Sequence, residues 1–264
     1  MTRALGPVTL SRWGQPGLLV RGFDTPASVV MGHARPYMGG HIERAGYAKA
    51  QDLIAYDYDV TRPMPSTGLR AVQRANARPD VAFRPMRMDR RHIKAEIETI
   101  VDIMHDAWSD NFGFVPMTQA EVAKIAGELR LVLRPVDTCI AEVGGRPMAF
   151  AMIFPNLNDA IRDLDGRLFP FGWAKLLWRL KVRRPTTGRM PLMGLRKELQ
   201  ATALGGALAL GVIEKTRALH AAEGARRGEL SWILEQNLPV RHIIEMIGGI
   251  AYKRYRIYGK SLPG

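Results

Sequence analysis

Apolar positions in the second half of the chain alternate between helical and strand spacing. The pattern predicts helices over residues 91–108, 118–133, 203–222 and 239–247, and strands over residues 81–88, 138–143, 147–154, 191–196 and 229–234. Thr118 and Glu121 form a capping box, and a Gly144-Gly145 turn closes a hairpin. This order predicts a mixed α/β (α+β) fold, a mostly antiparallel twisted sheet flanked by helices on both faces.

Two stretches near opposite ends of the chain share one pattern. Residues 41–47 (HIERAGY) and residues 243–249 (IIEMIGG) each read as an amphipathic helix stopped by glycine. A tyrosine-bearing strand follows each of them, over 52–58 and 252–258. Chance similarity is the alternative, because helix-glycine-strand is a common order. Internal duplication would give two related domains.

Composition between the two copies predicts the domain division. Residues 63–80 carry the proline, serine and glycine content of a linker. We therefore expect a C-terminal remnant of a first domain over residues 1–62, the linker over 63–80 and a complete second domain over 81–264. The remnant is too short to fold alone.

The charge balance indicates an anionic partner. Lys and Arg outnumber Asp and Glu by 38 to 25, giving a formal charge of +13. A phosphate-bearing cofactor, nucleic acid or an anionic membrane surface would fit. No nucleic-acid-binding motif accompanies the charge, which makes specific nucleic-acid binding the weaker choice.

Cysteine content and hydropathy bear on location and metal binding. The single cysteine, Cys139, has apolar neighbours and is predicted to be a core residue, and it allows no internal disulfide. The longest apolar run, residues 201–213, is shorter than a membrane span. We therefore expect a soluble, cytoplasmic protein without a metal.

The segment most indicative of chemistry lies where the strand over 191–196 leads into the long helix. The run Gln200-Ala201-Thr202-Ala203-Leu204-Gly205 opens that helix with small side chains. Consecutive backbone N–H groups at the positive end of a helix bind diphosphates. The run lacks the Gly-Lys-Ser/Thr of a P-loop and the three-glycine spacing of a dinucleotide fold. A helix start shaped only by close packing is the alternative.

This run resembles motif A of the GNAT acyltransferase superfamily, Gln/Arg-x-x-Gly-x-Gly/Ala, which grips the pyrophosphate of coenzyme A. Gln200 and Gly205 match the motif, and Ala203 stands where the first glycine is usual. A strand, Asn237 and a helix ended by Gly248 follow in the family's order. The resemblance therefore implies a GNAT domain in the second part of the chain.

The resemblance covers residues 81–264, and residues 17–60 resemble the final third of such a domain. Its missing first strands imply a truncated or late-started tandem GNAT protein, and whether Met1 is the true start stays open. The stretch over 108–116 resembles one bacterial subgroup of tandem proteins, some of them related to N-acyl amino acid synthases. Their acceptors are mostly undefined, so the acceptor and the oligomeric state stay open.

The resemblance implies that acetyl-CoA or another acyl-CoA is the co-substrate of an N-acyltransferase, with N-acetyl transfer as the first choice. The implied contacts are Gly194, Leu195, Arg196, Gln200, Ala201, Thr202, Ala203, Leu204, Gly205 and Asn237. Backbone N–H groups of the strand would hold the pantetheine and polarise the thioester, and an amine acceptor would attack directly. Asn237 could equally cap the following helix.

The catalytic residues are less well defined. In the family, a tyrosine four residues before the helix-ending glycine often protonates the departing thiolate, and Ile244 occupies that position. Tyr252 or Tyr255 would be substitutes, and Glu235 is a candidate general base unless it is simply solvated. Ala203, Ile244 and the incomplete first domain support an alternative function, a non-catalytic sensor of acyl-CoA or acyl-carrier protein.

Two further patterns have competing explanations. His105 and Asp110 fit the His-x-x-x-x-Asp pattern of glycerolipid acyltransferases, although a chain with six histidines matches it easily by chance. The insertion over 156–189 carries two short predicted helices with aromatic residues among basic ones. It would suit an anionic membrane surface or a long acyl chain, but core packing is favoured, with Leu168, Phe171, Leu176 and Leu180 covering the sheet.

Overall fold

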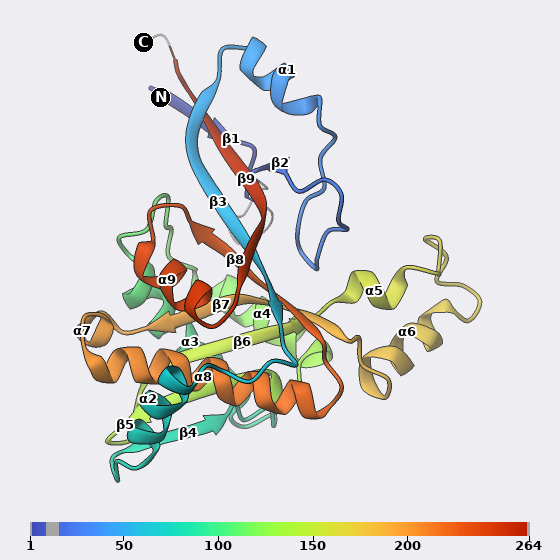
Figure 1. Cartoon of the computed structure of the whole chain (residues 1–264). Helices are drawn as coiled ribbons and strands as arrows, with labels where there is room; N and C mark the ends of the chain where they lie inside the picture. Colours follow the sequence, from blue (N-terminus) through green and yellow to red (C-terminus); the bar gives the residue numbers. More distant parts are fainter. Residues whose placement is uncertain (1, 9–15, 263–264) are drawn as a thin grey trace. The chain divides into compact units, whose positions relative to one another are not determined.

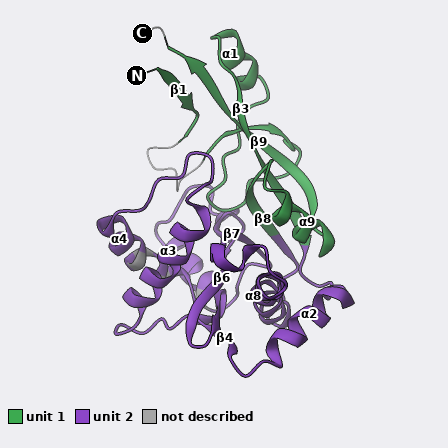
Figure 2. Cartoon of the chain, turned by 90° about the vertical axis from the view of Figure 1, so that its left-hand side faces the viewer, with its two compact units in different colours: residues 1–58, 229–264 green, residues 59–228 purple. Residues whose placement is uncertain are grey.

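The computed structural model describes residues 2–8 and 16–262 (Figure 1). These residues form two compact units, which Figure 2 colours separately. Unit 1 combines the chain up to residue 58 with the chain from residue 229 onward, and unit 2 contains residues 59–228. Segments from both ends of the sequence therefore build unit 1.

Unit 2 is a four-stranded antiparallel sheet with helices. Its elements are α2 (Ser66–Asn76), β4 (Val81–Pro85), α3 (Ile93–Trp108), α4 (Gln119–Val132), the 3-10 turn η1 (Pro135–Asp137), β5 (Thr138–Val143), β6 (Arg146–Pro155), α5 (Leu157–Ile161), α6 (Gly172–Lys181), β7 (Thr187–Leu195), α7 (Lys197–Gln200) and α8 (Ala203–Ala222). The strand order is β4-β5-β6-β7. The predicted capping box at Thr118 and the Gly144-Gly145 hairpin are both confirmed.

Helices cover both faces of this sheet, as predicted. On one face, Ala149 of β6 packs in a cluster with Leu208 of α8. On the other face, Phe150 and Gly194 lie against Ile103 of α3, where a Cβ on Gly194 would meet Phe150 Cε1 at 2.7 Å and Ile103 Cγ2 at 3.3 Å. Successive strand residues point to opposite faces, which explains why Ala149 and its neighbour Phe150 serve different helices.

Unit 1 contains β1 (Arg3–Gly6), β2 (Leu18–Arg21), α1 (Met38–Arg44), α9 (Leu238–Met246) and β9 (Ile250–Ser261). It also contains β3 (Ala48–Asp59) up to residue 58 and β8 (Arg227–Leu234) from residue 229. Its strand order is β1-β9-β3-β8, and β2 also pairs with β9. β9 is antiparallel to β1, β2 and β3. The N-terminal segment thus supplies an inner strand, β3, between two strands from the C-terminal segment.

Both predicted helix-glycine-strand copies are present in unit 1. α1 is followed by Gly46 with φ +83° and then β3, and α9 is followed by Gly248 with φ +97° and then β9. Leu53 pairs with Tyr255, which stands at the same offset of 202 residues as the two copies. Equivalent residues that face each other across an antiparallel pair are related by a local two-fold axis. This geometry supports the duplication hypothesis.

The segment predicted as a linker differs from the expectation, because α2 lies within it. The inner face of α2 consists of Gly68, Val72 and Ala75, and the helix packs on α8. A Cβ on Gly68 would meet Met64 Sδ at 2.9 Å, so the glycine permits close packing. Pro65, read as a linker residue, instead immediately precedes the helix.

The insertion forms two short helices, α5 and α6, as predicted, but most of its apolar side chains do not cover the sheet. Leu180 is buried, whereas Leu168 is 45% exposed and Phe171 is 76% exposed. The core-packing prediction was therefore wrong for Leu168 and Phe171. Leu168 lies in the connection between the two helices and Phe171 immediately precedes α6. In Figure 1, α5 and α6 extend beyond the strands β6 and β7.

Composition gave predictions about Cys139, about membrane spans and about location. Cys139 is a buried core residue, as expected, and desolvation raises the pKa of its thiol to about 12. None of the helices among the described residues has the length and apolar content needed to cross a bilayer. The cytoplasmic location stays a prediction.

Candidate functional site

The turn between β7 and α8 is braced by its own side chains. Gln200 Nε2 donates to Leu195 O at 2.9 Å. Thr202 Oγ1 donates to Leu199 O at 2.9 Å and accepts from the Gly205 N–H at 2.9 Å, which makes Thr202 the N-cap of α8. The side chains of Gln200 and Thr202 therefore fix the shape of the turn.

Close packing explains the glycine of this turn. A Cβ on Gly205 would lie 1.8 Å from Leu199 O, whereas a Cβ on Gly206 would meet nothing within 4 Å. Gly205 is thus required by the approach of the α7 backbone to the start of α8. Ala203, where the family usually has glycine, has an ordinary negative φ and needs no glycine. Its departure from the motif causes no backbone strain.

Two backbone donors at this turn are available to a ligand. Within residues 2–8 and 16–262, the N–H groups of Ala203 and Leu204 donate to no protein acceptor, as the first turn of an α-helix dictates. Ala201 precedes them, and its own N–H donates to Leu199 O. The 20-residue helix α8 adds the positive end of its dipole, and its first turn carries no acidic side chain. This arrangement fits a diphosphate.

A line of aspartates on α3 and just beyond it anchors the start of the turn. Asp102 accepts from Arg196 Nη2 at 2.5 Å, and Asp106 accepts from the Lys197 N–H at 2.7 Å. Asp110 accepts from Lys197 Nζ at 2.5 Å. The sequence indicated Asp110 only as part of the His-x-x-x-x-Asp pattern, and it did not indicate Asp102 or Asp106. Their spacing of four residues was the available signal, since it places them on one helix face.

Three residues at the end of β7, Gly194, Leu195 and Arg196, were expected to hold pantetheine through their N–H groups. The pairing with β6 leaves the N–H group of Leu195 on the side away from β6. The Arg196 N–H donates to Met148 O of β6 at 2.9 Å, which removes it from the groups open to a ligand. Hydrogen-bonding groups of successive strand residues point to opposite edges, so Gly194 also faces β6 and Leu195 faces away. On the side of β7 away from β6, Met193 O accepts from Trp108 Nε1 at 3.2 Å.

The candidate base and the candidate asparagine lie in unit 1, where both have structural partners. Glu235 accepts from Lys49 Nζ at 2.7 Å and from the Asp52 N–H at 3.1 Å. Asn237 Oδ1 accepts from the Val240 N–H at 3.3 Å and caps α9. Both side chains thus have structural contacts within unit 1, and a catalytic role for Glu235 stays a prediction.

The candidate proton donors are also in unit 1. The Tyr252 hydroxyl donates to Glu229, and burial, followed by the charge of Glu229, raises the pKa of Tyr252. A raised pKa weakens this phenol as a proton donor. Tyr255 is 1% exposed, and Ile244, at the usual tyrosine position, is also buried. Ser231 Oγ donates to the same Glu229 at 2.5 Å, so Glu229 organises a polar cluster that the sequence did not indicate.

The alternative His-x-x-x-x-Asp pattern has no catalytic geometry. His105 Nε2 accepts from the Met117 N–H at 3.0 Å, and the ring makes an edge contact with Phe114. Asp110 is the partner of Lys197. The histidine and the aspartate therefore serve different contacts.

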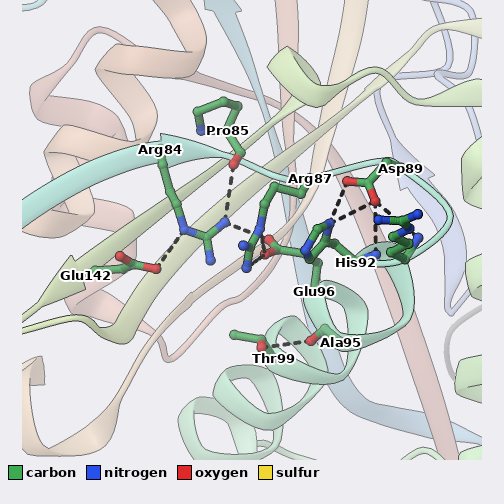
Figure 3. A network of polar contacts seen from close by, with 10 residues as sticks. Arg84, Pro85, Arg87, Asp89, His92, Ala95, Glu96, Thr99 and Glu142 are labelled. Carbon is green, nitrogen blue, oxygen red and sulfur yellow. Dashed lines mark hydrogen bonds and ion pairs between the residues drawn. The ribbon is translucent and has the colours of Figure 1, made fainter.

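A second polar cluster in unit 2 joins β4, β5 and α3 (Figure 3). Arg84 Nε donates to Glu142 at 2.7 Å and Arg84 Nη1 to Glu96 at 2.7 Å, while Arg87 Nε donates to Glu96 at 2.8 Å. Burial acts to raise the pKa of Glu96, but the hydrogen bonds from both arginines outweigh it and the pKa is lowered. Its partners give this cluster a structural role.

The sheet, the helices on both faces and the turn into α8 form the GNAT fold. Solved structures with this fold include a GCN5-related N-acetyltransferase from Sphaerobacter thermophilus, with TM-score 0.56 and 14% identity over 90% of this chain and 59% of that chain. A tandem GNAT protein from the clavulanic acid biosynthesis pathway has TM-score 0.50 and 11% identity over 94% of this chain and 64% of that chain. At these identities the likeness shows the fold alone.

Sequence relatives identify the family more closely. A bacterial ceramide synthase from Caulobacter vibrioides is 44% identical over 261 residues, covering 99% of this chain and 67% of the relative. The protein YghO from Escherichia coli is 40% identical over 257 residues, covering 97% of this chain and 65% of the relative. No family model matches the chain. The chain belongs to the acyltransferase family of the bacterial ceramide synthase, and it spans about two thirds of the length of both relatives.

Proposed function

We propose that this chain is an N-acyltransferase that moves an acyl group from acyl-CoA to the amine of a long-chain amino alcohol, forming a ceramide-type amide. The 44% identity to a bacterial ceramide synthase over 99% of the chain carries the proposal. A ceramide is the amide of a long-chain amino alcohol, so the acceptor class follows from the chemistry of that product. Acyl-CoA is made in the cytoplasm, which is where the proposal places the reaction.

The turn between β7 and α8 supports acyl-CoA as the donor. The N–H groups of Ala203 and Leu204 would receive the diphosphate of coenzyme A at the positive end of α8. The Leu195 N–H, on the β7 edge away from β6, would contact the pantetheine arm. Gln200 and Thr202 then act indirectly, because their side chains hold the turn in the shape that presents these donors.

The chemistry needs no covalent enzyme intermediate. The neutral amine attacks the thioester carbonyl, the C–N bond forms, the C–S bond breaks, and the proton lost by nitrogen ends on the thiolate sulfur. Ile244 cannot supply that proton, and Tyr252 is a weakened donor. General-acid help contributes about 10²–10⁴-fold to such steps, so transfer of the proton through water gives a slow enzyme.

The test uses the full chain with acetyl-, octanoyl- or palmitoyl-CoA and sphinganine in mixed micelles. Mass spectrometry follows the N-acyl product, and a thiol reagent follows free coenzyme A. We expect N-acyl sphinganine, formed fastest with a fatty acyl donor. Product from acetyl-CoA alone would keep N-acyl transfer but restrict it to N-acetylation. Tight acyl-CoA binding without any product would overturn the proposal in favour of a sensor.

A further inference from the structure

Residues 157–184, which we call the insertion hairpin, expose an unusual number of large apolar side chains. Eight of those exposed among the described residues belong to it, including Leu168, Phe169, Phe171, Trp173, Leu177 and Trp178. Phe169 is 82% exposed and Phe171 is 76% exposed. Single exposed apolar residues are ordinary, but a group of this size marks an interaction surface. In Figure 1, α5 and α6 extend beyond β6 and β7, away from the other helices of unit 2.

Three hydrogen-bond donors at the tip of the hairpin have acceptors within the hairpin. Trp173 Nε1 donates to Pro170 O at 3.0 Å, and the Trp173 N–H donates to Leu168 O at 2.9 Å. The Arg167 N–H donates to Leu164 O at 2.7 Å. These bonds leave the aromatic rings as the outward surface, so the tip can enter an apolar medium without stranding these donors.

The hairpin is also braced, which keeps its apolar side chains together. Asp163, between the two helices, accepts from Lys175 Nζ at 2.5 Å and from Arg179 Nη2 at 3.0 Å. Arg179 Nη1 donates to Ala160 O of α5 at 2.7 Å. The two helices are thus tied on their polar side, and the side chains of Trp173 and Leu177, one helical turn apart on α6, stay exposed.

The positive charge of the insertion hairpin favours an anionic partner. The hairpin has seven Lys or Arg residues against three Asp, a surplus of four positive charges, within a chain of net charge +13. Exposed Arg167 lies two residues before Phe169, and exposed Arg183 follows the end of α6. Phe and Trp beside Lys and Arg are the composition of segments that lie at a lipid-water interface.

We propose that the insertion hairpin docks this chain on an anionic phospholipid bilayer. Phe169 and Phe171 enter the headgroup region, α6 lies along the interface, and the basic side chains contact lipid phosphates. This inference stands on the hairpin alone and does not rest on the proposed reaction. If both hold, docking brings the enzyme to the surface in which long-chain acceptors reside.

The test is vesicle sedimentation of the full chain with phosphatidylglycerol-phosphatidylcholine vesicles and with phosphatidylcholine vesicles. We expect binding to the anionic vesicles that weakens in high salt. The double variant Phe169→Ser/Phe171→Ser should bind about tenfold more weakly or worse. The charge variant Arg167→Glu/Arg183→Glu should also lose affinity, although it keeps every aromatic side chain.

Ile250→Ser is the matched control, because Ile250 is 67% exposed but lies on β9, outside the hairpin. It should bind vesicles like the wild type. Circular dichroism checks that each variant folds, and light scattering measures self-association. Equal vesicle binding by the wild type and the Phe169→Ser/Phe171→Ser variant would overturn the proposal. So would a change in oligomeric state without a change in vesicle binding, which would show that a second copy covers the patch.

Discussion

Gly205 and Gly206 are neighbours in α8 with opposite surroundings. A Cβ at position 205 would collide with Leu199 O, while the space around position 206 is open. The family resemblance rests on a glycine at position 205, and packing gives that glycine a physical reason. Its contribution to acyl-CoA binding is therefore expected to be indirect, through the shape of the turn that exposes the Ala203 and Leu204 N–H groups.

Gly205→Ala should push α7 away from the start of α8. We expect a loss of about 1–3 kcal/mol in the free energy of unfolding, as for other overpacked sites, together with weaker acyl-CoA binding. Gly206→Ala should instead stabilise the helix by up to about 1 kcal/mol and bind acyl-CoA normally. Chemical denaturation and calorimetry with acyl-CoA measure both effects. Identical behaviour of the two variants would contradict this account of the turn.

Tyr252 offers a test of the proton donor. Tyr252→Phe removes a hydrogen bond to buried Glu229, so we expect a loss of about 1–3 kcal/mol of stability. If protons reach the thiolate through water, kcat should change far less than the roughly 10²–10⁴-fold typical of a lost general acid. The measurement is kcat against pH for wild type and variant. A fall of that size with loss of the alkaline limb would establish Tyr252 as the acid.

At the level of elements, local signals predicted the structure well. The range of α8, residues 203–222, was predicted to the residue, and the capping box of α4 and the β5–β6 turn were also found, because each is encoded by neighbours in sequence. α2 was missed because its buried face is made of small residues such as Gly68 and Ala75, which lower the apolar signal. At the candidate site, the sequence indicated the turn over residues 200–205, but it did not indicate the aspartates that hold the start of this turn. Arg196 meets Asp102 across 94 residues, a separation that local patterns do not encode.

The Glu96 carboxylate joins α3 to β4 through Arg84 and to the following segment through Arg87 (Figure 3). Glu96→Gln should lower the free energy of unfolding near neutral pH by about 1.5–3 kcal/mol. The folded-state pKa of Glu96 lies below its ordinary 4.5, so its stabilisation is present above pH 4.5 and disappears as the pH falls through the folded pKa. Urea denaturation across this pH range should show the free energies of unfolding of the wild type and of Glu96→Gln becoming equal in acid. A constant difference at every pH would refute this role for the Glu96 charge.

At the scale of the whole molecule, sequence and structure divide the chain differently. The sequence indicated a complete second domain over 81–264, but unit 1 draws strands from both ends of the chain. β3 lies between β8 and β9, and its pairing with β9 brings Leu53 opposite its repeat equivalent, Tyr255. The sequence showed the two helix-glycine-strand copies, because each copy is a pattern of neighbouring residues. It did not show the pairing of the two copies, because that pairing joins segments about 200 residues apart.

This arrangement predicts that neither part of the chain folds properly alone. A peptide of residues 1–62 has a few strands and one short helix, too little for an independent core. A fragment of residues 63–264 lacks β3 and leaves the edges of β8 and β9 unpaired, so it should aggregate. Mixed together, the fragments should restore a cooperative thermal transition in circular dichroism.

Leu53→Pro in the short peptide removes a backbone donor and locks φ in the middle of β3, so it should abolish this restoration. Arg62→Ala, at an exposed position near the cut, should leave the restoration intact, because the Arg62 side chain is ion-paired with the nearby exposed Asp59 and is not part of the β3–β9 pairing. Titrating the peptide into the fragment and following the transition separates the two variants. A cooperative transition in either fragment alone would contradict this prediction. It would show that a domain can fold without the β3–β9 pairing, as the predicted complete domain over residues 81–264 implied. Restoration by the Leu53→Pro peptide would show that the fragments assemble without the β3–β9 pairing.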